Sequence, residues 1–134
     1  MKFLGIIISL LIPVCAMAQQ NLSEDEKAEK QMRTAIDAQI ESLTRSLELE
    51  DWQVFYVDSI MTHDYGAMSD ELKALQTAKV GNTDAYQRTQ DKWMEQMYQA
   101  FNKVFNGQQW AKYQKSGAAR DKKARDKREA KRGK

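Results

Sequence analysis

The chain has 134 residues, with one cysteine and one proline, Cys15 and Pro13, both near the N-terminus. Its length indicates a single domain, and one cysteine leaves no pair for an internal disulfide. The net charge of +2 hides an uneven distribution. Residues 19–114 carry ten basic and sixteen acidic side chains, whereas residues 115–134 carry ten basic and three acidic ones. An acidic body therefore precedes a basic tail, an asymmetry typical of an interaction segment.

The N-terminus has the pattern of an exported protein. Lys2 supplies a positive charge, residues 3–14 form a short apolar run, and the small residues Ala16 and Ala18 fit a signal peptidase site. We expect a signal peptide over residues 1–18 that is cleaved after Ala18. The mature chain would then begin at Gln19 in the periplasm or outside the cell.

A lipoprotein is the less favoured interpretation of the same segment. Cys15 would carry the lipid, but Pro13 and Val14 are poor residues for the two positions before a lipidated cysteine. The apolar run is also shorter than the ~20 residues that a helix needs to span a bilayer. We therefore expect a soluble helical domain over residues 19–114 and a basic C-terminal tail over residues 115–134.

The residues after the signal predict an all-α protein of antiparallel helical hairpins, with three to four helices in an elongated body. The mature part has no proline and is rich in strong helix formers. Ser23 and Glu26 form a capping box that begins the first helix. Its apolar residues recur every three or four positions, which suits the seam of a hairpin. They are Ala28, Met32, Ile36, Ile40, Leu43 and Leu47.

A second helix is expected from about residue 51 to residue 77, and its composition predicts the most buried helix of the protein. Its expected apolar positions are Trp52, Phe55, Tyr56, Ile60, Met68, Leu72 and Leu75, with Val54, Val57 and Met61 widening the face. Gly66 interrupts this helix, which favours a kink or a close helix contact. Gly81 is suited to the left-handed position that ends a helix.

A third helix follows Asn82, Thr83 and Asp84, each of which can cap its start. Its apolar stripe contains Tyr86, Trp93, Met97, Phe101 and Val104. Asn106 can cap a fourth, shorter helix that carries Trp110 and Tyr113. We expect the three tryptophans of the chain, Trp52, Trp93 and Trp110, to be packing anchors. Beyond Lys115 the tail would be either helical or disordered.

Two short stretches share one pattern, in which an apolar residue precedes a cap position and a glutamine follows three residues after the cap. They are Leu49, Glu50 and Gln53 in the first copy, and Phe105, Asn106 and Gln109 in the second. The glutamine at this spacing can complete a capping box. The pair resembles the Leu-Thr-x-x-Gln motifs of the Spy/CpxP-like family of periplasmic proteins. Glu50 and Asn106 stand where that family has threonine, and Phe105 stands where it has leucine.

The resemblance implies a thin, cradle-shaped, all-helical homodimer. Such a protein would hold non-native envelope proteins without ATP, or regulate a sensor of envelope stress. It would need no cofactor. An enzyme is the least favoured class, because nucleophile activation would need His63, the only histidine, and no catalytic motif accompanies it. One histidine beside Asp64 does not support a transition-metal site either.

Two sets of residues are candidates for binding a client or partner. Met94 and Tyr98 flank the stripe of the third helix and offer adaptable apolar contacts. In the tail, Arg120, Lys123, Lys127 and Lys131 would align along one face of a helix. Anionic lipid, lipopolysaccharide phosphates, acidic client proteins or the acidic body of a second copy are the expected partners, and nucleic acid is not expected for an exported protein. A solvated tail without a ligand is the simpler alternative.

We therefore carry two hypotheses about function. The first is an exported, ATP-independent holding protein for non-native or partner proteins. The second is a structural protein attached to the envelope, whose basic tail docks on an anionic surface. Salt separates them, because electrostatic docking weakens with ionic strength more than apolar holding does.

Overall fold

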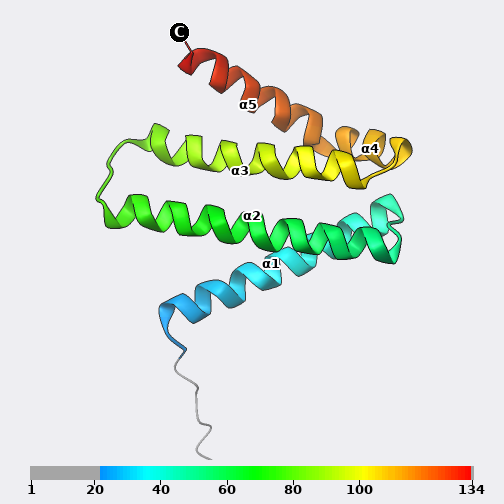
Figure 1. Ribbon diagram of the computed structural model, residues 1–134, viewed down its shortest axis with the longest axis horizontal. Helices are drawn as coiled ribbons and strands as arrows, with labels where there is room; N and C mark the ends of the chain where they lie inside the picture. Colours follow the sequence, from blue (N-terminus) through cyan, green and yellow to red (C-terminus); the bar gives the residue numbers. More distant parts are fainter. Residues whose placement is uncertain (1–21, 134) are drawn as a thin grey trace, which may run out of the picture.

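The computed structural model describes residues 22–133, and this part of the chain is helical with no strand (Figure 1). The elements in order are α1 (Glu24–Leu47), α2 (Asp51–Thr77), α3 (Thr83–Val104), α4 (Gly107–Tyr113), a π-helical turn η1 (Gln114–Ala118) and α5 (Ala119–Arg132). The all-α prediction is confirmed. The expected signal peptide and its cleavage site lie outside the described residues.

The helices form an elongated stack. Figure 1 shows α2 and α3 as a long antiparallel hairpin, with α1 crossing α2 on the side away from α3. The short α4 turns at the far end of α3, and α5 runs back along the outer side of α3. One core joins α1, α2 and α3 at the end near α4. Its buried residues are Ile36, Ile40, Leu47, Leu49, Val57, Met61, Met97, Phe101 and Phe105.

The start of α1 agrees with the sequence prediction. The Glu26 amide donates to Ser23 Oγ at 3.2 Å, and the Ser23 amide donates to Glu26 Oε2 at 2.9 Å, which completes the capping box. Ile36 and Ile40 are buried, but Ala28 is exposed. The apolar stripe is therefore buried only in the second half of α1, which packs on α2. The first turns of α1 diverge from α2 (Figure 1).

Two expectations about glycines in and after α2 are wrong. The helix runs from Asp51 to Thr77 through Gly66, and a Cβ added at Gly66 would meet no atom within 4 Å, so there is no close helix contact there. After α2 the left-handed conformation belongs to Lys79, with φ 54°, and not to Gly81. The chain therefore reverses between α2 and α3 without using the glycine that the pattern favoured.

The caps of α3 and α4 are both asparagines. Asn82 Oδ1 accepts from the amide of Asp84 at 2.9 Å, and Asn106 Oδ1 accepts from the amide of Gln109 at the same distance. Of the three residues that could cap α3, the structure uses Asn82. Helix α4 begins directly after Asn106, as expected.

Aromatic rings close the core at the α4 end. The ring centroids of Phe101 and Phe105 are 5.3 Å apart, and Tyr113 of α4 packs edge-on against both at 5.7 and 5.5 Å. Trp110 lies beside Tyr113 at 5.6 Å. Burial raises the pKa of the Tyr113 hydroxyl to about 12. The short helix α4 is thus held by the aromatic residues at the end of α3.

The basic tail is ordered as a helix that folds back on the body. Gly117 has φ 122° and ψ −13°, a conformation that glycine adopts far more readily than other residues. This residue interrupts the helical path after α4 and redirects the chain, so α5 runs back over α3 at a slant (Figure 1). The next residue, Ala118, is buried. Of the two states expected for the tail, the helical one is observed.

Candidate functional site

The two copies of the glutamine motif meet in the folded chain. Gln53 Nε2 donates to Gln109 Oε1 at 2.6 Å, and Gln109 Nε2 donates to Gln53 Oε1 at 3.0 Å. Each glutamine also reaches the end of the helix that precedes the other copy. Gln53 Nε2 donates to the carbonyl oxygen of Val104 at 3.0 Å. Gln109 Nε2 donates to the carbonyl oxygen of Leu47 at 3.3 Å.

The amide oxygens complete the arrangement. Gln53 Oε1 accepts from the amide of Glu50, and Gln109 Oε1 accepts from the amide of Asn106, both at 2.9 Å. Each side-chain amide therefore uses both of its donors and both of its acceptor positions. Because the two glutamines are buried, these hydrogen bonds replace those that water would otherwise make. The pair fixes the ends of α1 and α3 against the starts of α2 and α4.

The other motif residues are structural as well. Leu49 is buried in the core, as is Phe105 at the equivalent position of the second copy. Asn106 is exposed but is occupied as the cap of α4. The motif residues thus build the end of the helical stack and offer little free surface to a partner.

The largest exposed apolar residues lie next to this motif, at the start of α2. The exposed fractions are 51% for Trp52, 67% for Phe55 and 51% for Tyr56. We call these three residues the aromatic patch. The Tyr56 ring lies 6.1 Å from that of Trp52 and 5.7 Å from that of Phe55, edge-on in both cases. Trp52 was expected to be a packing anchor, and this expectation is wrong.

The burial of Gln53 explains why the aromatic patch faces outward. The buried positions of α2 are Gln53, Val57, Met61 and Asp64, which step by four, four and three residues along one face. Residues one position before or after this face must point elsewhere, because successive helical residues differ by about 100°. Sequence reasoning assigned the largest rings to the core, but the polar Gln53 takes the inward position.

A shallow groove of about 610 Å³ lies beside the aromatic patch, between α2 and α3. Trp52, Tyr56 and Ile60 line it from α2. Ala100 and Lys103 are among the residues that line it from α3. The groove combines apolar walls with a cationic edge.

The structure does not bring Met94 and Tyr98 to the aromatic patch. The Tyr98 hydroxyl accepts from Gln114 Nε2 at 2.6 Å, and its ring packs edge-on against Trp110 at 4.9 Å. The Arg125 guanidinium lies over the Tyr98 ring at 5.4 Å. Tyr98 is therefore engaged by the elements that follow α3, and Met94 is half-buried one turn before it.

A ladder of ion pairs joins α5 to α3. Arg128 makes two hydrogen bonds to the Asp91 carboxylate, at 2.9 and 2.7 Å. Arg132 reaches Asp91 at 3.2 Å and Asp84 at 3.0 Å. Nearer the start of α5, Lys122 and Arg125 pair with Glu95 at 3.0 and 3.3 Å. Sequence reasoning treated the tail by itself and missed this ladder.

The ladder perturbs the acids of α3. The hydrogen bond from Arg128 lowers the pKa of Asp91, and the hydrogen bond from Arg132 lowers the pKa of Asp84. For Glu95, desolvation acts to raise the pKa, but hydrogen bonds from Gln99, Lys122 and Arg125 together outweigh it and lower the pKa. All three acids thus favour the charged form that holds α5.

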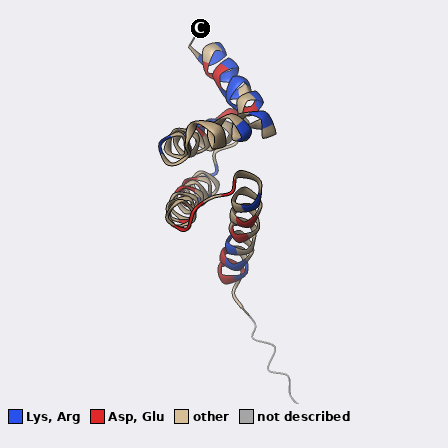
Figure 2. Ribbon diagram, turned by 90° about the vertical axis from the view of Figure 1, so that its right-hand side faces the viewer, with Lys and Arg blue, Asp and Glu red and all other residues tan. Residues whose placement is uncertain are grey.

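The predicted tail residues lie on the other face of α5. Arg120, Lys123, Lys127 and Lys131 are all exposed. Arg120 has one contact with its neighbour Asp121 at 3.4 Å. The three lysines form no ion pair with any acid in residues 22–133. In the ribbon of Figure 2, Lys and Arg residues predominate over Asp and Glu along α5.

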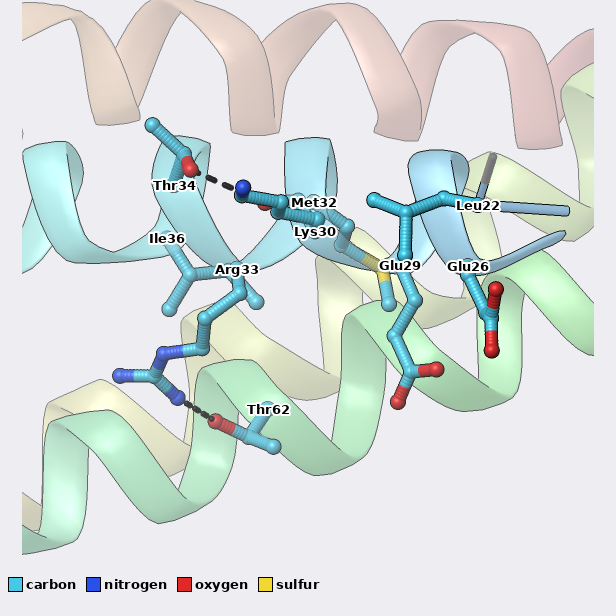
Figure 3. A pocket seen from close by; sticks show the side chains of 9 residues that line it. All are labelled: Leu22, Glu26, Glu29, Lys30, Met32, Arg33, Thr34, Ile36 and Thr62. Carbon is cyan, nitrogen blue, oxygen red and sulfur yellow. Dashed lines mark hydrogen bonds between the residues drawn. The ribbon is translucent and has the colours of Figure 1, made fainter. Parts of the chain in front are cut away.

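A second hollow, of about 480 Å³, lies along the first half of α1 (Figure 3). Met32 and Ile36 form part of its apolar lining, and Glu26 and Glu29 contribute carboxylates. The Arg33 side chain reaches across it to Thr62 of α2 at 3.0 Å (Figure 3). Arg33 also donates to Asp58 of α2 at 2.9 Å. This hydrogen bond from Arg33 lowers the pKa of Asp58. The contact ties α1 to α2 where their apolar packing ends.

His63 and Asp64 form the only histidine–carboxylate contact within residues 22–133. His63 Nδ1 lies 2.8 Å from Asp64 Oδ1, and Gln96 Nε2 donates to the same oxygen at 3.2 Å. Asp64 is buried, but the His63 ring is mostly exposed. The described part of the chain contains no group of three or more side chains placed to hold a metal ion.

None of the described helices combines the length and apolar character needed to cross a bilayer. Comparison of the chain with protein-family models, with curated proteins and with solved structures gives no match. The features of the chain that point to a function are therefore the aromatic patch, the groove and the two faces of α5.

Proposed function

We propose that this protein is an exported, ATP-independent binding protein that holds non-native or partner proteins of the cell envelope and performs no chemistry on them. The observation that carries the proposal is the aromatic patch. The Tyr56 ring packs against both of the others, and each of the three residues has half or more of its surface exposed to solvent. Contiguous exposed apolar groups of this kind mark surfaces that bind other macromolecules.

The surroundings of the aromatic patch support a client of mixed character. Lys103 lies at one edge of the adjoining groove, and Glu50 and Asp51 lie where α2 begins. Glu50 Oε2 accepts from the Trp52 indole at 2.5 Å, which orients the ring. Exposed apolar groups beside both signs of charge favour brief and plural contacts with unfolded chains over one tight contact.

We also propose kinship with the Spy/CpxP-like group, in a homodimer. The meeting of the two glutamine motifs supports kinship, because it gives both imperfect copies one shared structural role. The N-terminal export pattern agrees with a periplasmic location.

The test is suppression of aggregation. A reduced, unfolding test protein is mixed with residues 19–134 without nucleotide, and light scattering is followed. The proposal expects protection near equal molar ratio. It also expects the variant Trp52→Ser, Phe55→Ser, Tyr56→Ser to lose most of this protection. Because the three side chains are exposed, this variant should remain folded by circular dichroism.

The matched control replaces three exposed polar residues, in the variant Gln31→Ser, Gln76→Ser, Gln90→Ser. It should protect like the original chain. The mass of each protein in solution is measured by light scattering, so that a lost dimer is not mistaken for a lost client surface. If the original chain gives no protection at several-fold excess, the proposal fails. If the aromatic variant and the glutamine control protect the test protein equally well, the client surface does not include the aromatic patch.

A further inference from the structure

The basic side chains of α5 divide between two faces. One face is turned to α3, and its cations are paired with acids: Lys122, Arg125, Arg128 and Arg132. The other face carries Lys123, Lys127 and Lys131, spaced by four residues and exposed. We call these three residues the lysine row. At about 100° per residue, the row lies on the side of α5 away from the paired face.

The paired face fixes the direction of the lysine row. Arg125 has 9% of its side chain exposed and Arg132 has 11%, so both are held between α5 and α3. Rotation of α5 about its axis would break these ion pairs and bury lysines against the acids of α3. The row is therefore held outward on one side of α5. Lys123 and Lys131 are about 12 Å apart along the helix axis and are turned by about 80° about it.

The acids of α5 do not neutralise the lysine row. Asp126 pairs with Lys122 at 2.6 Å, and Glu129 contacts Arg132 at 3.4 Å. Asp121 contacts Arg120 at 3.4 Å. Each acid of α5 is thus directed to a cation outside the row, which leaves three adjacent positive charges in solvent.

We propose that the lysine row docks this protein on the surface of an anionic phospholipid bilayer. Docking goes beyond the holding of clients, which does not require it. Three exposed lysines on the convex outer side of a helix match an extended array of phosphates better than they match a small ligand, which needs a concave site. The row contains no aromatic or large apolar side chain. The contact would therefore be with head groups, without insertion into the acyl chains.

The charge of the rest of the molecule sets the orientation on the membrane. Residues 19–114 carry a net charge of −6 and would be repelled by an anionic surface, whereas residues 115–134 carry +7. Helix α5 lies on the outer side of the stack, next to α3 and remote from α1 (Figure 1). Docking through the row would leave the aromatic patch of α2 free for a client.

The expected affinity is modest and depends on salt. Each lysine near an anionic surface contributes about fivefold to partition, so the row contributes about a hundredfold. The Debye length falls from about 14 Å near 50 mM salt to about 7 Å near 200 mM, which screens the row strongly. The partition coefficient should therefore fall about tenfold or more over this range of salt.

The experiment measures co-sedimentation of residues 19–134 with vesicles of phosphatidylglycerol and phosphatidylcholine, and with vesicles of phosphatidylcholine alone. The proposal expects salt-sensitive binding to the first and none to the second. The variant Lys123→Gln, Lys127→Gln, Lys131→Gln should lose about a hundredfold in partition. The control Lys30→Gln, Lys79→Gln, Lys103→Gln removes the same charge from exposed positions elsewhere and should lose less than threefold.

Three outcomes of the binding measurements would overturn the proposal. They are equal binding to both vesicles, equal losses in the two triple variants, and tighter binding to soluble polyphosphate than to the anionic vesicles. A large gain in helicity on docking would also contradict it, because α5 is already a helix before contact. The row variant should still suppress aggregation. Failure of docking can therefore be told apart from failure of the holding function.

Discussion

Gln53 and Gln109 are hydrogen-bonded to each other through both of their side-chain amides, with Nε2 to Oε1 distances of 2.6 and 3.0 Å. The remaining amide hydrogens bond carbonyl oxygens at the ends of α3 and α1. Four helix ends are thus joined by two side chains. Removal of either glutamine leaves buried polar groups without partners, which costs more than the loss of a solvent-exposed hydrogen bond.

Gln109→Ala should therefore lower the free energy of unfolding by about 2–4 kcal/mol. Gln108→Ala, at the exposed neighbouring position, should change it by less than about 0.5 kcal/mol. Urea titration followed by circular dichroism measures both. In the double variant Gln53→Ala, Gln109→Ala the loss of unfolding free energy should be smaller than the sum of the two single losses. Either single variant already removes the hydrogen bonds between the two side chains, so the double variant cannot lose them again. Additive losses would contradict the reciprocal pair.

The same pair shows how far the sequence could predict the fold. Helix starts were predictable because capping is local: Ser23, Asn82 and Asn106 each hydrogen-bond a backbone amide within three residues. The motif spacing also suggested that Gln53 and Gln109 would act alike. Their contact with each other was not predictable, because it joins residues 56 positions apart and depends on how the hairpins pack.

The aromatic patch was predicted wrongly for a related reason. Hydrophobicity favours burial of Trp52 and Phe55, but the inward face of α2 begins at Gln53. Because Gln53 has a complete set of hydrogen bonds, it can occupy the inward position. The buried face of α2 is therefore shifted by one residue from the face that hydrophobicity predicts. Composition alone does not reveal such a residue, since glutamine is usually exposed.

For the basic tail, the sequence predicted the exposed face but not the contacts of the other face. The four-residue spacing of Lys123, Lys127 and Lys131 indicated a shared helical face, and this face is the exposed one. The pairing of Arg128 with Asp91 could not be predicted, because it depends on the reversal of the chain at Gly117. A glycine between two helices signals a break but not its direction.

Gly66→Ala should stabilise the protein by about 0.5–1 kcal/mol. Gly66 lies inside α2, and an added Cβ would meet no atom within 4 Å, so alanine would gain helix propensity without a clash. The matched control is Ala67→Gly at the next helical position, which should destabilise by a similar amount. Thermal unfolding of both variants measures the difference. A lower midpoint for Gly66→Ala would show that this position needs glycine after all.

Gly117→Ala should separate α5 from α3. The observed φ of 122° is strained for alanine by about 1–3 kcal/mol. The chain can avoid this strain by continuing α4 straight into α5, which would carry the basic helix away from the body. Small-angle scattering should then show a longer molecule, and amide hydrogens of α5 should exchange faster. Gly133→Ala is the control, since Gly133 has φ −77°. An unchanged scattering profile would contradict the role of Gly117.

The docking of α5 should fail in acid, at a pH set by the acids of α3. The pKa values of Asp84, Asp91 and Glu95 are lower in the folded chain than usual. Groups of this kind contribute stability that is complete above the unfolded pKa, about 4, and that is lost as the pH falls through the folded pKa. Protection of the α5 amides should therefore be constant from pH 7 to about pH 5 and should decline below about pH 4.

Hydrogen exchange, corrected for its intrinsic dependence on pH, measures this protection, with the amides of α2 as the internal reference. The variant Asp91→Asn removes the charge that Arg128 and Arg132 share. It should already weaken protection of α5 at neutral pH and should flatten the acid-dependent loss. Added salt should act in the same direction as acid, because it screens the ladder. If protection is lost between pH 7 and pH 5, the contact of α5 with α3 depends on a group that titrates near neutrality. The carboxylate ladder would then not be its cause.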